Sequence, residues 1–223
     1  MATISLSTRH GRITAWKSVP PSQPRGAVII IQEIFGVNNH IRQVVDQFAR
    51  RGYVAVAPAL FDVIHPGMEL AYDEAGVARG KELVEELGFN GAFDGVRAAY
   101  DHLESDFRVA TVGFCWGGTV AFLCNTRMGI RSVSYYGART VPFLRERPKA
   151  PLMMHFGEND PSITPEDIAL HRESLPTAEI IVWPGAGHGF NCDQRPNDYN
   201  PEVAAQAMDR TVGFLRKHLL HTT

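Results

Sequence analysis

One short segment, Gly-Phe-Cys-Trp-Gly-Gly at residues 113–118, constrains the fold of this chain more than any other. The residues before it, 108–114, are β-rich and mostly apolar, which is typical of a buried parallel strand. The residues after it, 119–123, are suited to the start of a helix. A strand, a turn with glycines at its tight positions and a helix together predict a nucleophile elbow with Cys115 at its centre.

Cys115 is therefore the candidate nucleophile. A helix that begins here directs its unpaired N–H groups and its positive dipole end at the side chain, which favours the thiolate and stabilises a developing oxyanion. The backbone N–H of Trp116 is the expected first oxyanion donor. The alternative is a buried structural cysteine beside a glycine-rich turn, but the flanking pattern favours the nucleophile.

A nucleophile of this kind needs a base and an acid that orients the base. A strand-like run at 151–157 is followed by Glu158 and Asp160, and a second run at 180–183 is followed by His188 between two glycines. Nucleophile, acid and then histidine is the chain order of α/β-hydrolases. Asp160 is preferred as the acid because it lies deeper in its loop and precedes a proline, and Glu158 remains open. His188 is predicted as the base, since a histidine between glycines is poorly suited to a packed core.

Four further motifs extend the pattern over most of the chain: Gln-Glu-Ile-Phe-Gly at 32–36, Tyr-Tyr-Gly at 135–137, Gly-Glu-Asn-Asp at 157–160 and Gly-His-Gly-Phe at 187–190. With these motifs the chain resembles the dienelactone hydrolase family, a branch of the α/β-hydrolases with a cysteine nucleophile. The resemblance implies an α/β-hydrolase fold, which is a mostly parallel sheet covered by helices on both faces, with a minimal cap domain or none.

The resemblance also assigns roles to two residues of the 32–36 motif. It implies that Glu33 is a buried carboxylate that helps to control ionisation of the thiol, and that the backbone N–H of Ile34 is the second oxyanion donor. Glu33 follows five apolar residues, 27–31, and a charge at the end of an apolar strand needs a partner. This supports a functional role for Glu33, against the alternative of a solvated strand end.

The substrate is less constrained than the chemistry. Members of the resembled family recognise the carboxylate of a small unsaturated lactone through cationic side chains, often four residues beyond the histidine, where this chain has Cys192. Arg79 is the candidate that the resemblance suggests for this role and Arg195 lies nearby in sequence, although both have the alternative of an ordinary surface arginine. Four aromatic side chains are candidates for an apolar substrate pocket, with core packing as the open alternative: Phe35, Trp116, Tyr136 and Phe190.

The predicted function is hydrolysis of a small ester or lactone through an acyl-enzyme on Cys115, the activity of a carboxylic ester hydrolase of the carboxymethylenebutenolidase type. Two alternatives stay open. One is a thioesterase or general carboxylesterase on the same fold, and the other is a non-catalytic binding protein that has kept the pocket. Neither a cofactor nor a metal is expected.

Composition fits one domain over residues 1–223, since 223 residues with 44% hydrophobic content can bury one sizeable core. The net charge of −2 gives no basic surface for nucleic acid or anionic lipid, so neither partner is expected. Three cysteines without regular spacing predict neither disulfides nor a metal site, and no leader or membrane segment is apparent. We expect a cytoplasmic protein that is a monomer or weak homodimer. The remaining histidines, His155 among them, have no ligand spacing and are assigned packing or solvated roles.

Strand and helix patterns alternate along the chain, as in a mostly parallel sheet. Residues 13–19 are predicted as an antiparallel edge strand, and the segment from 58 to about 76 is irregular. The remaining predicted elements are strands at 27–32, 53–57 and 132–136, and helices that begin after Asn38 or Asn39, over 69–87 and 93–103, at Thr164-Pro165 and at Asn200-Pro201.

Overall fold

The computed structural model describes residues 1–220, and these fall into two compact units. The first unit contains residues 1–110 with 219–220, and the second contains residues 111–218. Each unit contains both helices and parallel strands, so the α/β class is confirmed. That residues 1–223 make a single domain stays a prediction.

The first unit holds four complete strands, in the order β1-β2-β4-β3. They are β1 (Ala2–Thr8), β2 (Gly11–Ser18), β3 (Ala27–Ile31) and β4 (Val54–Pro58). β1 and β2 form an antiparallel pair, β2 pairs antiparallel with β4, and β3 and β4 run parallel. Every residue of β3 and β4 is buried, as expected of strands that are covered on both faces.

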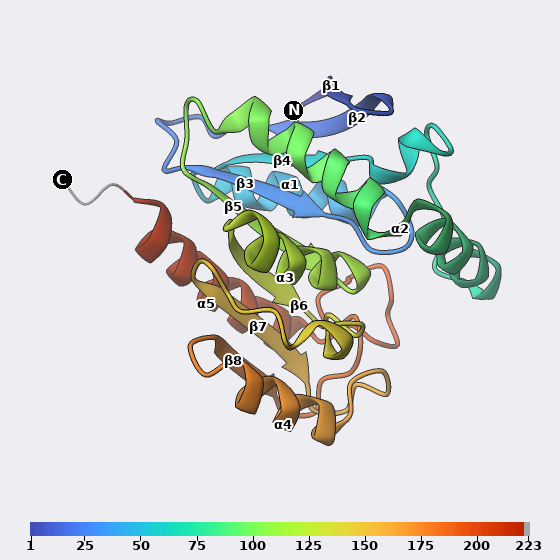
Figure 1. Cartoon of the computed structure of the whole chain (residues 1–223), viewed down its shortest axis with the longest axis vertical. Helices are drawn as coiled ribbons and strands as arrows, with labels where there is room; N and C mark the ends of the chain where they lie inside the picture. Colours follow the sequence, from blue (N-terminus) through green and yellow to red (C-terminus); the bar gives the residue numbers. More distant parts are fainter. Residues whose placement is uncertain (221–223) are drawn as a thin grey trace. The chain divides into compact units, whose positions relative to one another are not determined.

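Two helices and one short 3-10 helix complete the first unit. They are α1 (Asn39–Arg50), η1 (Leu60–Val63) and α2 (Glu74–Leu103). In Figure 1, α1 lies behind the strands of this unit and the second half of α2 lies in front of them. Of the two candidates for the start of this helix, Asn38 is the cap, because its side chain accepts a hydrogen bond from Ile41 N at the start of α1.

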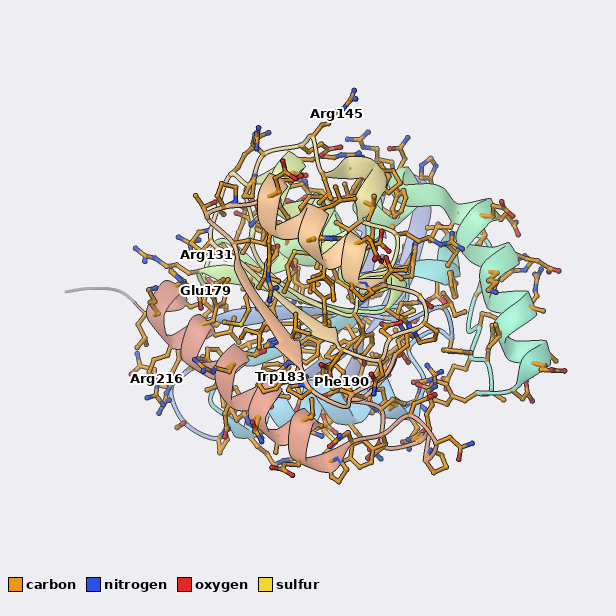
Figure 2. All side chains as sticks on the ribbon, turned by 90° about the horizontal axis from the view of Figure 1, so that it is seen from below. Arg131, Arg145, Glu179, Trp183, Phe190 and Arg216 are labelled. Carbon is orange, nitrogen blue, oxygen red and sulfur yellow. The ribbon has the colours of Figure 1, made fainter. Side chains whose placement is uncertain are left out.

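The second unit is built around parallel strands. β6 (Arg131–Tyr135), β7 (Leu152–Gly157) and β8 (Glu179–Trp183) follow β5 (Val109–Phe114), and the pairs β6–β7 and β7–β8 are parallel. Its helices are α3 (Trp116–Met128), η2 (Val141–Phe143), α4 (Pro165–Ser174) and α5 (Pro201–Leu219). Figures 1 and 2 show α3 and α4 on one side of these strands and α5 on the other.

Local sequence signals set the bounds of these helices. The Thr164 side chain accepts from Asp167 N and the Asp167 side chain accepts from Thr164 N, a capping box that begins α4. The side chain of Asn200 accepts from Val203 N at the start of α5. The buried side chains of α5 include Ala204, Met208, Thr211 and Leu215.

Two expectations differ from the structure. The antiparallel strand predicted at 13–19 is present as β2, but it is not an edge strand, because β1 pairs along its outer side. The two helices predicted at 69–87 and 93–103 are present as the two halves of α2, which meet at a kink where Gly88 has φ 61°, but the first half begins at Glu74 and not at residue 69. No helix in residues 1–220 has the length and apolar character that crossing a membrane requires.

Candidate active site

Cys115 occupies a strained turn between β5 and α3, as an elbow requires. It is the N-cap residue of α3, with φ 54° and ψ −120°, a backbone conformation that non-glycine residues rarely adopt. Its backbone N–H donates to Tyr135 O at 3.0 Å, which ties the turn to the end of β6. A side chain at Gly113 would overlap the Gly117 carbonyl. The predicted elbow is therefore present, with its cysteine half-buried.

His188 lies between Cys115 and Asp160 and contacts both. Its Nε2 is 3.1 Å from Cys115 Sγ, and its Nδ1 is 2.8 Å from Asp160 Oδ2. Because a carboxylate only accepts hydrogen bonds, Nδ1 carries the proton and Nε2 faces the sulfur. Three side chains from three loops that are far apart in sequence thus form one continuous hydrogen-bonded chain.

Asp160, rather than Glu158, is the carboxylate in contact with His188. The Asp160 side chain is fully buried, and its second oxygen accepts from Ser162 N at 2.8 Å. Glu158 is exposed, and its side chain accepts from Gly185 N at 2.9 Å. The structure thus brings Asp160, and not Glu158, into contact with His188, and the role of Asp160 as the acid stays a prediction.

The surroundings of His188 favour its protonated form. Burial by itself lowers the pKa of His188, but the charge on Cys115, the hydrogen bonds with Asp160 and Cys115, and the charge on Asp160 outweigh burial and raise the pKa to about 10. An imidazolium that persists at neutral pH is the partner that a thiolate needs. The arrangement can therefore hold a thiolate–imidazolium pair.

The Tyr136 ring packs against the imidazole in the second unit, and Phe190 packs against Tyr136. The Tyr136 ring centroid is 5.1 Å from that of His188, and the Phe190 ring is 5.1 Å from Tyr136 with its edge toward it. Tyr136 and Phe190 are both 0% exposed, and Trp116, the first residue of α3, is 3% exposed. These side chains are part of the packing of the site, and their contact with a substrate stays a prediction.

The other predicted site residues belong to the first unit. Glu33 directly follows the end of the apolar β3 region and is 0% exposed. Its Oε2 accepts from the Tyr72 hydroxyl at 2.8 Å, whereas Oε1 has no hydrogen-bond partner within residues 1–220. Tyr72 also accepts from Asn38 Nδ2 and packs its ring 4.5 Å from that of Phe35. Sequence reasoning missed Tyr72, which lies in the irregular segment before α2 and carries no pattern of its own.

Arg79 lies on the first half of α2 and is engaged with neighbouring side chains. Its Nη1 donates to Glu82 Oε2 at 2.8 Å, and its Nη2 is 3.1 Å from His65 Nε2. One turn of the same helix, at Gly80, approaches the Ile34 carbonyl so closely that a side chain would overlap it. Whether Arg79 binds a substrate stays a prediction.

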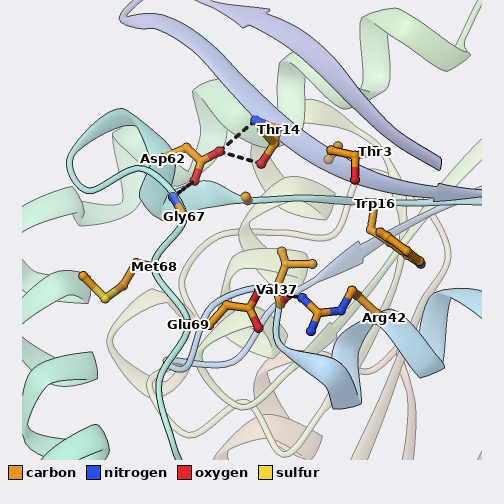
Figure 3. Close-up of a pocket in the computed structure, with 11 residues that line it drawn as sticks. Thr3, Thr14, Trp16, Val37, Arg42, Asp62, Gly67, Met68 and Glu69 are labelled. Atoms are coloured by element: carbon orange, nitrogen blue, oxygen red, sulfur yellow. Dashed lines mark hydrogen bonds and ion pairs between the residues drawn. The ribbon is translucent and has the colours of Figure 1, made fainter.

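A pocket of about 200 Å³ lies in the first unit, lined by β1, β2, the start of α1 and the segment after β4 (Figure 3). None of the predicted site residues lines it. Its charged groups are already engaged by neighbouring residues of the first unit. Asp62 accepts from Thr14 N, Thr14 Oγ1 and Gly67 N, and Arg42 donates to Glu69 Oε1. The pocket is distinct from the Cys115, His188 and Asp160 cluster, all of which belongs to the second unit.

An elbow residue, a histidine and an aspartate at the carboxyl ends of parallel strands are the features of an α/β-hydrolase. Comparisons with known proteins agree with this class and narrow it. A model of the dienelactone hydrolase family matches residues 13–219. The chain belongs to the dienelactone hydrolase family, a family of hydrolases.

The relatives and solved structures are similar over nearly their whole lengths. A Synechocystis sp. protein named "Putative carboxymethylenebutenolidase" is 34% identical over 86% of this chain and 86% of its own. The carboxymethylenebutenolidase of Pseudomonas putida is 31% identical, and the match covers 88% of this chain and 87% of that protein. The crystal structure of "Putative Dienelactone Hydrolase from Klebsiella pneumoniae subsp. pneumoniae" has a TM-score of 0.87 and 26% identity, and covers 97% of this chain and 98% of its own.

Proposed function

We propose that this hydrolase cleaves a small ester or lactone by acyl transfer through Cys115, with His188 as base and Asp160 as the residue that orients it. One observation carries the proposal. His188 Nε2 is 3.1 Å from Cys115 Sγ while its Nδ1 is 2.8 Å from Asp160 Oδ2, which is the geometry of a nucleophile, a base and an acid acting as a unit.

The reaction has two halves. In the first, the Cys115 thiolate attacks the carbonyl carbon, the tetrahedral intermediate collapses, and the C–O bond breaks as His188 gives its proton to the leaving oxygen. In the second, His188 takes a proton from water, the hydroxide attacks the thioester, and the acid leaves as the C–S bond breaks. The proton on His188 then restores the thiolate–imidazolium pair.

Three further roles belong to the same proposal. The backbone N–H groups of Trp116 and Ile34 are the oxyanion donors, and Glu33 controls ionisation of the thiol. Support for Trp116 is its position as the first residue of a helix, where N–H groups and the dipole favour an anion. Support for Glu33 is a fully buried carboxylate with a single hydroxyl donor. The role of Ile34 rests on the family resemblance.

The substrate proposal is a compact ester or lactone, with Phe35, Tyr136 and Phe190 as apolar walls and Arg79 as the candidate for a substrate carboxylate. Arg79 already pairs with Glu82, so an anionic substrate would have to compete with that carboxylate. Arg79→Gln tests the assignment: a role in recognition predicts a higher KM for a lactone that carries a carboxylate and an unchanged KM for a neutral ester. Equal effects on both substrates would remove Arg79 from the binding site.

The decisive experiment is intact mass spectrometry after mixing with a panel of small lactones and esters. We expect an acyl adduct that maps to Cys115. Cys115→Ala should lose the adduct and at least about 10³-fold in rate, because a nucleophile cannot be replaced by its partners. Cys124→Ala is the matched control, since it removes a buried thiol from the same helix α3. Esterase activity that survives in Cys115→Ala would rule out the mechanism.

Relative rates on small lactones, aryl esters and acyl thioesters separate the lactonase from a thioesterase or general carboxylesterase. A non-catalytic binding protein would cleave none of them, and its Cys115 would react with alkylating agents no faster than free cysteine. None of Cys115, Cys124 and Cys192 forms a disulfide, which suits a nucleophilic thiol in a reducing compartment such as the cytoplasm.

A further inference from the structure

Tyr136 shares an unusual backbone property with the nucleophile. Among residues 1–220, Cys115 and Tyr136 are the two non-glycine residues with positive φ, and that of Tyr136 is 41°. Such conformations are costly and persist only where the surrounding structure imposes them. The contacts of the turn around Tyr136 must therefore impose this conformation, and the conformation in turn sets where the Tyr136 ring lies.

The cause is a turn after β6 that is fixed on both sides. The Tyr136 N–H donates to His155 O of β7 at 2.8 Å. At the next residue, Gly137, a side chain would lie 2.7 Å from Ser134 Oγ and 3.0 Å from the backbone of Gly118 in α3. The hydrogen bond to β7 and the close approach of Gly137 to α3 fix the turn in which Tyr136 adopts its strained conformation.

The consequence is the position of the Tyr136 ring. The ring is 0% exposed and lies 5.1 Å from the His188 imidazole at an interplanar angle of 59°. Phe190 in turn packs against Tyr136, with the centroids of these two rings 5.1 Å apart and the rings nearly perpendicular. Asp160 fixes only one ring nitrogen of His188, so the imidazole would still be able to tilt about that hydrogen bond. The Tyr136 ring restricts this tilt.

We propose that Tyr136 is a positioning residue: its strained backbone places its ring against His188 and so keeps Nε2 directed at Cys115 Sγ. The inference rests on the proposed function of Cys115 and His188. The charged groups that face the imidazole are Cys115 from the elbow and Asp160 from the loop after β7. The Arg195 guanidinium lies beside Gly189 and pairs with Asp198.

The test is the rate at which iodoacetamide alkylates Cys115, measured against pH by peptide mass spectrometry. This readout needs no substrate. Tyr136→Leu keeps a non-glycine residue on the strained backbone but removes the ring. The imidazole is then less well aligned, the thiolate loses stabilisation, and the midpoint of the profile should rise by about one pH unit, with an about tenfold lower rate on the acid side. Tyr136→Phe keeps the ring and should retain the wild-type profile.

Two additional variants keep the test decisive. Tyr136→Met also removes the ring, but methionine fills more of the vacated space than leucine. If only one of Tyr136→Leu and Tyr136→Met folds, that variant is sufficient for the test. Phe156→Leu is the matched control for the effect of a cavity. Phe156 lies in β7 of the same unit, and its fully buried ring packs against His171 and not against His188. This control variant should leave the midpoint where it is in the wild type.

The outcomes separate the two proposals. If wild-type Cys115 reacts no faster than free cysteine at any pH, the proposed function fails. If the wild type has a low midpoint but Tyr136→Leu and Tyr136→Met share it, the proposed function stands and the positioning role of Tyr136 is wrong. A shift in Tyr136→Phe equal to that in Tyr136→Leu would assign the effect to the hydroxyl and would also overturn the inference.

Discussion

The charge on His188 has a consequence for stability that can be measured on a single residue. Its pKa rises from 6.5 to about 10 on folding, mainly because the Cys115 charge and the Asp160 hydrogen bond outweigh burial. A raised pKa means that the folded state holds the proton more tightly than the unfolded state. The stability that this proton contributes is complete below pH 6.5 and is lost as the pH rises through about 10.

The corresponding prediction compares the wild type with His188→Gln. The wild type should be the more stable at pH 6.5, and the difference in free energy of unfolding should shrink steadily toward pH 10.5. Urea unfolding at three pH values in this window measures it. A difference that is constant across the window would mean that His188 is not held as an imidazolium.

At the scale of secondary-structure elements, the close approach of α3 to β6 depends on Gly118. A side chain there would lie 2.7 Å from Tyr135 O and 2.8 Å from Ser134 Oγ. We therefore expect Gly118→Ala to destabilise the protein by about 1–3 kcal/mol through overpacking, although alanine is the better helix former. Because Tyr135 O also holds Cys115 N, esterase activity should fall with stability.

Gly213 provides the matched substitution in another helix. It lies in α5, and a side chain at Gly213 would meet no atom within 4 Å. Gly213→Ala should therefore stabilise the protein by about 0.5–1 kcal/mol and leave activity unchanged. Thermal and urea unfolding of both variants checks the pair. A stabilised, fully active Gly118→Ala would contradict the close packing of the elbow.

Most elements were predictable because their signals are local. Caps at Asn38 and Thr164 and the apolar runs of the buried strands carry the information in a few neighbouring residues. β1 was missed because it is largely exposed and polar, with Leu6 as its one fully buried side chain. The sequence also predicted two helices on either side of residues 88–92, and α2 is interrupted there, at Gly88.

The same distinction applies to the candidate site. Cys115, Asp160 and His188 were predictable because each follows a recognisable strand, and parallel strands bring such loops to one edge of a sheet. The preference for Asp160 over Glu158 rested on its deeper place in the loop and on the proline after it, and the contact of Asp160 with His188 agrees with that preference. The contact of Tyr72 with Glu33 joins residues 39 positions apart and has no sequence signature.

For the molecule as a whole, we expect acid stability to depend on a buried histidine outside the candidate triad. His155 of β7 is fully buried and joins three other elements. Trp183 Nε1 of β8 donates to its Nδ1 at 3.1 Å, and its Nε2 lies 3.1 Å from Thr211 Oγ1 of α5, which in turn bonds to the Tyr135 hydroxyl of β6. Since an indole N–H only donates, Nδ1 must remain unprotonated. His155 is therefore held in its neutral form.

Burial, with a smaller effect from the charge of Arg210, lowers the pKa of His155 to about 3. The unfolded chain takes up this proton near pH 6.5 and the folded chain does not, so folding loses about 1.4 kcal/mol for each pH unit as the pH falls from 6.5 toward 3. The free energy of unfolding of His155→Gln should lack this component and fall less steeply with acid. Guanidinium titrations between pH 7 and 4 measure both slopes.

Thr211→Val is the control that separates proton uptake from packing. It removes the hydroxyl that links His155 to Tyr135 but no titrating group. It should therefore lower the free energy of unfolding by about 1–3 kcal/mol at every pH, and the slope of that free energy against pH should equal the slope of the wild type. If Thr211→Val flattened the slope as His155→Gln does, the acid sensitivity would arise from the network as a packed unit. If neither variant changed the slope, carboxylates elsewhere in the chain would control acid unfolding, and His155 would have no part in it.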